Sequence, residues 1–75
     1  MAVPEQLEWM EEVCERHGMK RVPGREKICC KYEKDGLSVE SCDCGWTYEV
    51  NLDGRTWLVP AGRAELEQCL IDLGY

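Results

Sequence analysis

The stretch that decides the fold runs Lys27-Ile-Cys-Cys-Lys-Tyr-Glu-Lys-Asp-Gly-Leu-Ser-Val-Glu-Ser-Cys-Asp-Cys-Gly45. Asp35-Gly36 divides it into two alternating segments, and this dipeptide favours a two-residue hairpin turn because both residues tolerate positive φ. The turn places Cys29 directly opposite Cys42, and the alternation of a strand sends Cys30 to the other, apolar face. The sequence therefore predicts a β-hairpin at the centre of a sheet.

A second Asp-Gly pair, Asp53-Gly54, predicts another hairpin turn of the same kind. The segments on either side of it, 46–51 and 56–59, alternate between apolar and polar residues as strands do. The side chains that we expect on the core face of the first segment are Trp46, Tyr48 and Val50. We expect an apolar patch on the outer face, typical of an interface if no helix covers it, at Leu52 and Leu58.

Two segments show the apolar period of amphipathic helices. The first runs from Pro4 to His17, with five glutamates on its polar side. Its apolar side is expected to hold Leu7, Met10 and Cys14. The second runs from Gly62 to Leu73, and its apolar stripe is expected to hold Leu66, Cys69, Leu70 and Leu73.

Met19 to Arg25 is expected to be a connector, because Pro23-Gly24 marks a turn. The predicted fold is α+β: an antiparallel four-stranded, or three-stranded, meander sheet with N-terminal and C-terminal helices packed on one face. The element order is α-β-β-β-β-α, in a single domain over residues 1–75. This order resembles that of double-stranded-RNA-binding domains, which run α-β-β-β-α. That family has a basic cluster at the start of its last helix, whereas residues 62–67 here are mostly acidic, so we carry over no RNA-binding function.

The chain is acidic, with 15 acidic and nine basic residues among 75, a net charge of −6. Residues 1–15 contribute five glutamates and no lysine or arginine. An acidic domain repels the phosphate backbone, so direct binding to nucleic acid is not expected.

The first residues, Met-Ala-Val-Pro-Glu-Gln-Leu-Glu, contain neither the basic start nor the apolar run of a signal peptide. No apolar run approaches the about 18 residues of a membrane helix. We therefore expect a cytoplasmic protein, a location in which thiols stay reduced.

The six cysteines allow two readings of the hairpin. Cys29, Cys42 and Cys44 are expected on the outer face, where three thiolates form an incomplete zinc site. Alternatively, Cys29 and Cys42 form a cross-strand disulfide. The cysteines on the apolar faces are expected to be small buried hydrophobic residues, and they are Cys14, Cys30 and Cys69.

No pattern in the chain is typical of an enzyme. Phosphate-binding loops, nucleotide-binding fingerprints and paired catalytic carboxylates are not found in the sequence. His17 is the only histidine, and its place in the last turn of a predicted helix is typical of a cap. We predict a protein that is not an enzyme and needs no cofactor, with zinc as the alternative.

The acidic first helix is the candidate binding surface. Its residues expected to contact a partner are Glu5, Glu8, Trp9, Glu12 and Glu15. Carboxylates on one helical face can stand where phosphates would, and so can block a basic nucleic-acid-binding surface of a partner protein. Small inhibitors carried by phages and mobile elements have a similar size and charge. The open sheet face offers a second contact surface, through which the chain could form a homodimer.

Overall fold

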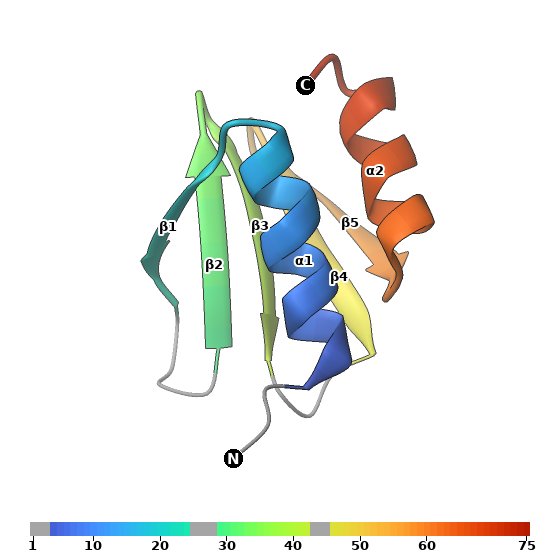
Figure 1. The fold of residues 1–75 in the computed structure, drawn as a ribbon. Coiled ribbons are helices and arrows are strands. Elements are labelled where there is room, and N and C mark those ends of the chain that lie inside the picture. The colour runs from blue at the N-terminus through green and yellow to red at the C-terminus, as the bar shows by residue number, and fades with distance from the viewer. Residues whose placement is uncertain (1–3, 25–28, 43–45) are drawn as a thin grey trace.

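The computed structural model describes residues 4–24, 29–42 and 46–75, without the side chain of Cys42. It contains two helices and five strands (Figure 1). Their bounds are α1 Glu5–Arg16, β1 Lys20–Pro23, β2 Cys29–Lys34, β3 Leu37–Cys42, β4 Thr47–Leu52, β5 Arg55–Pro60 and α2 Arg63–Asp72. The α+β class and the position of both helices relative to the sheet agree with the sequence-based prediction.

The five strands form one antiparallel sheet in chain order, β1-β2-β3-β4-β5. Asp35 and Gly36 have φ values of 47° and 85°, and Asp53 and Gly54 have φ values of 50° and 82°. Positive φ at both central residues defines the type I′ turn, whose twist matches that of the flanking strands. Cys29 is the Cα partner of Cys42, so the predicted register of the central hairpin is confirmed.

The additional strand, β1, corrects the prediction for the segment Met19 to Arg25. Residues 20–23 of this segment form β1 rather than a connector, and Val22 pairs with Lys31 of β2. β1 is at the edge of the sheet, and an edge strand tolerates a proline such as Pro23 because one of its sides needs no hydrogen-bond donor. Arg25 lies outside the described residues.

Both helices lie on the same face of the sheet, with α1 across its middle and α2 beside β5 (Figure 1). The core between the layers comprises Leu7, Met10, Val13, Cys14, Met19, Tyr32, Leu37, Val39, Tyr48, Val50, Val59, Leu66 and Leu70. Tyr48 is completely buried there, and its hydroxyl donates a hydrogen bond of 2.6 Å to the backbone carbonyl of Gln6 in α1. This bond fixes the first turn of α1 over the sheet.

Two apolar residues do not lie where we expected them. Trp46 is 71% exposed, because it lies in a bend before β4, where the alternation of the strand no longer fixes the direction of its side chain. Leu52 is the Cα partner of Leu37 and packs against the core, so its predicted place on the outer face is wrong. The alternation that places Val50 on the inner face requires the same of Leu52. Leu58 is 71% exposed on the outer face, as predicted.

Candidate functional site

The two helices carry the entire excess of negative charge. Together α1 and α2 contain eight acidic and two basic side chains, which gives −6, the net charge of the chain. The rest of the sequence contains seven acidic and seven basic residues. Since both helices lie on one face of the sheet (Figure 1), the molecule has an acidic helical face, while the rest of the sequence carries no net charge.

Four glutamates of α1 form a ridge along the middle of this face. Glu5, Glu8, Glu12 and Glu15 are all exposed, and they follow one another at steps of three or four residues, which places them on one side of the helix. With a rise of about 1.5 Å per residue, the ridge is about 15 Å long. We call these four residues the acidic ridge.

A contact with α2 fixes part of this predicted binding surface. Arg63 donates from Nε to a carboxylate oxygen of Glu12, and its guanidinium carbon lies 5.7 Å from the centre of the Trp9 ring. Trp9 is half-buried. Local sequence patterns could not reveal the contact of Arg63 with Glu12, because 51 residues separate the two.

His17 forms a second link between the helices. Its Nε2 lies 2.7 Å from a carboxylate oxygen of Glu67, and its Nδ1 lies 2.8 Å from the backbone carbonyl oxygen of Tyr75. The Arg16 guanidinium is 3.7 Å from the same Glu67 oxygen. Both ring nitrogens of His17 therefore have partners within the helical layer, and the residue holds the end of α1 against α2.

The structure separates the cysteines into two groups. Cys29 is in a disulfide bond, whereas Cys14, Cys30 and Cys69 are free. Burial, and to a smaller extent the charge of Glu15, raises the pKa of the Cys14 thiol to about 12. Burial also raises the pKa of the Cys69 thiol. Thiols that remain protonated at neutral pH are poor nucleophiles.

Two of the three predicted zinc ligands are not described by the structure: Cys44 lies outside the described residues, and the side chain of Cys42 is also outside them. Within the described part of the chain, no group of three or more histidine, cysteine, aspartate or glutamate side chains could hold a metal ion. The sulfur of Cys29 is engaged in its disulfide and is not a thiolate. A zinc site at these three cysteines therefore requires the reduced protein.

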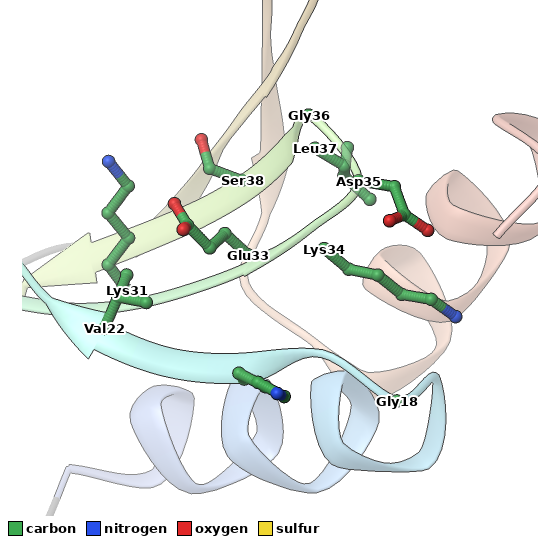
Figure 2. Close-up of a pocket in the computed structure, with 10 residues that line it drawn as sticks. Gly18, Val22, Lys31, Glu33, Lys34, Asp35, Gly36, Leu37 and Ser38 are labelled. Atoms are coloured by element: carbon green, nitrogen blue, oxygen red, sulfur yellow. The ribbon is translucent and has the colours of Figure 1, made fainter.

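A hollow of about 530 Å³ lies at the turn end of the β1, β2 and β3 strands. Figure 2 shows Lys31, Glu33 and Ser38 pointing away from the side to which Lys34 points. Lys34 donates from Nζ to the backbone carbonyl of His17 at 2.9 Å. The described lining contains charges of both signs and neither cysteine nor histidine. Its side chains diverge, so they do not form the convergent polar group that a small-molecule site requires.

Comparisons of the chain with protein-family models, curated proteins and solved structures find no match. Among the described residues, neither helix has the length and apolar character needed to cross a membrane. The acidic helical face is therefore the candidate site that the structure itself distinguishes.

Proposed function

We propose that this protein is a small, non-enzymatic interaction module that occupies a basic, nucleic-acid-binding surface of a partner protein. The observation that supports this function is the segregation of charge, since the net charge of −6 resides on the two helices of one face. A surface with one sign of charge attracts a partner of the opposite sign and orients it before contact.

The spacing of the acidic ridge supports an inhibitor that competes with nucleic acid. Its four carboxylates extend over about 15 Å, or one charge per about 5 Å. One strand of DNA carries a charge per about 3.4 Å of helix axis. Although Arg63 pairs with Glu12, the spacing of the carboxylates along the ridge is of the same order as that of the phosphates in a nucleic-acid strand, and the helix holds them on a rigid support.

Trp9 supplies an apolar contact beside these charges. It is half-buried next to the ridge, and Arg63 covers its ring. Tryptophan is among the residues most often found to dominate binding energy at protein interfaces. In this proposal the glutamates bring the partner to the face, Trp9 anchors it, and the encounter takes place in the cytoplasm.

The test compares two variants of equal net charge. Glu8→Lys/Glu15→Lys reverses two residues of the ridge, and Glu33→Lys/Glu49→Lys reverses two residues of the sheet. Each pair of reversals changes the net charge from −6 to −2. Immobilised wild-type protein and both variants are exposed to the heparin-binding proteins of the organism that carries the gene.

We expect a basic protein to bind the wild type and the sheet variant, and to bind the ridge variant at least about tenfold more weakly. Addition of the wild-type protein should also release nucleic acid from that partner. Equal binding by the two variants, or a partner that keeps its nucleic acid, contradicts the proposed function. Circular dichroism of all three proteins establishes that they are folded.

A further inference from the structure

The sheet has two edge strands with different side chains. β1 and β5 are the first and last strands of the sheet. Three of the four residues of β1 are charged or proline, and such residues protect an edge from pairing with another chain. β5, in contrast, has four successive residues that are neither charged nor proline, 56–59, and Leu58 among them is 71% exposed. β5 is thus the less protected edge.

The register shows which backbone groups of β5 face outward. Leu52 and Arg55 close a two-residue turn and form a hydrogen-bonded pair, after which bonded and non-bonded pairs alternate along the strands. The hydrogen bond of 2.9 Å from Ala61 N–H to the Trp46 carbonyl fits this alternation. The N–H and C=O groups of Thr56 and Leu58 therefore point away from β4, about 6.8 Å apart along the edge.

A groove of about 680 Å³ runs between this edge and α2, which returns alongside β5 (Figure 1). Trp57, Val59, Cys69 and Leu73 provide apolar surface in the groove. Its α2 side also carries acidic residues, Glu65 and Asp72. The groove thus combines an apolar floor, an acidic wall and unpaired backbone groups along one side.

We infer that this groove binds an extended segment of a partner protein, which adds to the sheet as a strand beside β5. Its main chain would pair with Thr56 and Leu58, and its alternate side chains would enter the groove. The side chain opposite Trp57 would be apolar. A lysine or arginine two residues away on the same side would lay its stem on the apolar floor and reach Glu65 or Asp72. This site does not depend on the acidic ridge.

Charge favours such a segment over a second copy of this chain. Pairing two β5 strands would bring two α2 helices together, and each carries three acidic residues and one basic residue. Each chain also has a net charge of −6. A basic segment gains from the same charges that would repel a second copy.

The probe is a fluorescein-labelled peptide, Gly-Ser-Lys-Thr-Val-Thr-Lys-Ser-Gly, designed to pair antiparallel with β5, with lysine on both sides of valine so that a cation can reach either Glu65 or Asp72. Its control, Gly-Ser-Lys-Pro-Val-Pro-Lys-Ser-Gly, has the same charge but lacks the two N–H groups that would pair with the edge. Fluorescence anisotropy with the full-length protein measures both affinities. We expect the threonine peptide to bind at least about tenfold more tightly than the proline peptide, because it alone makes the main-chain hydrogen bonds.

Protein variants test the same contacts from the other side. Leu58→Pro removes an outward N–H and leaves the ladder to β4 intact, as Pro60 already does two residues further along the strand. Leu58→Thr is its matched control, because it removes the exposed apolar side chain and keeps the N–H. We expect Leu58→Pro to abolish the preference for the threonine peptide and Leu58→Thr to retain it. Glu65→Gln/Asp72→Asn should weaken binding by about two- to fivefold.

Equal affinity for the two peptides overturns the inference, as does wild-type peptide preference in a folded Leu58→Pro variant. If that variant does not fold, the peptide pair alone decides. A concentration-dependent dimer in sedimentation that Leu58→Pro dissociates also overturns it, because a second copy would then occupy the edge. The Glu8→Lys/Glu15→Lys variant should keep its preference for the threonine peptide, which separates this site from the proposed function.

Discussion

The hydrogen bond between Tyr48 and Gln6 gives a sharp test of how the helical layer is held on the sheet. Tyr48 is fully buried, and its hydroxyl is 2.6 Å from the Gln6 carbonyl oxygen. Tyr48→Phe removes the hydroxyl and keeps the ring. The Gln6 carbonyl loses one donor but keeps the bond of the helix to the N–H four residues later.

The expected loss of stability is therefore that of one buried hydrogen bond, about 1 to 2 kcal/mol. In a domain of 75 residues, 1 kcal/mol corresponds to a change in melting temperature of about 6 °C. Tyr48→Phe should accordingly melt about 6 to 12 °C below the wild type, as measured by circular dichroism at 222 nm.

Tyr75→Phe is the matched control, because it makes the same chemical change at an exposed hydroxyl, which donates to the Asp35 carbonyl at 3.1 Å. Surface changes of this kind alter stability by about 0.5 kcal/mol or less, or about 3 °C here. The reasoning is refuted if Tyr48→Phe melts within 2 °C of the wild type, or if the two variants lose the same stability.

Alkaline pH should destabilise the fold, because burial is the main cause that raises the pKa to about 12 in each of three groups, Cys14, Tyr32 and Tyr48. Their ordinary values are 9.0 for the thiol and 10.0 for the phenols, so the unfolded chain loses these protons first. The free energy of unfolding should then be steady below pH 9 and fall above it, by up to about 1.4 kcal/mol per pH unit for each group; a urea midpoint unchanged up to pH 11 would contradict this. Cys29→Ser should lower the free energy of unfolding of the oxidised protein by about 3 kcal/mol, the value for a disulfide to Cys42 that closes a loop of about 14 residues. Peptide mapping without reductant identifies the partner sulfur, and equal melting of variant and wild type under oxidising conditions argues against a stabilising disulfide. The zinc hypothesis predicts that elemental analysis finds one equivalent of zinc in the reduced protein and none in the oxidised protein. The hypothesis is wrong if a chelator leaves the melting temperature of the reduced protein unchanged.

The sheet could be predicted from the sequence wherever local chemistry fixes the register. The two Asp-Gly turns set the pairing of four strands, because a two-residue turn permits only one register of the strands that it joins. β1 gave no comparable signal, since it is four residues long and contains one β-branched residue. Its pairing depends on the outer edge of β2, which no local pattern reveals. The position of Trp46 was wrongly predicted because the alternation of β4 begins only at Thr47, the residue after it.

The candidate site, like the sheet, could be predicted from the sequence only where local patterns determine it. The acidic ridge follows from helical periodicity, which is a local property of residues 5–15. The contact of Arg63 with Trp9 and Glu12 joins distant segments, and so appears only once both helices share a face. The groove beside β5 has the same origin, because it depends on where α2 packs.

The order of the strands also bears on how fast the chain folds. Every strand pairs with its neighbour in sequence, so the sheet can grow from the central hairpin without closing a long loop. Proteins dominated by such short-range pairing tend to fold quickly, whereas long-range pairing slows folding. The contacts between α1 and α2 join the two ends of the chain, and among them His17 and Glu67 are 50 residues apart. The entropy cost of closing the loop between these two ends is smallest once the sheet is formed. Substitutions at His17 should therefore speed unfolding and leave the folding rate nearly unchanged.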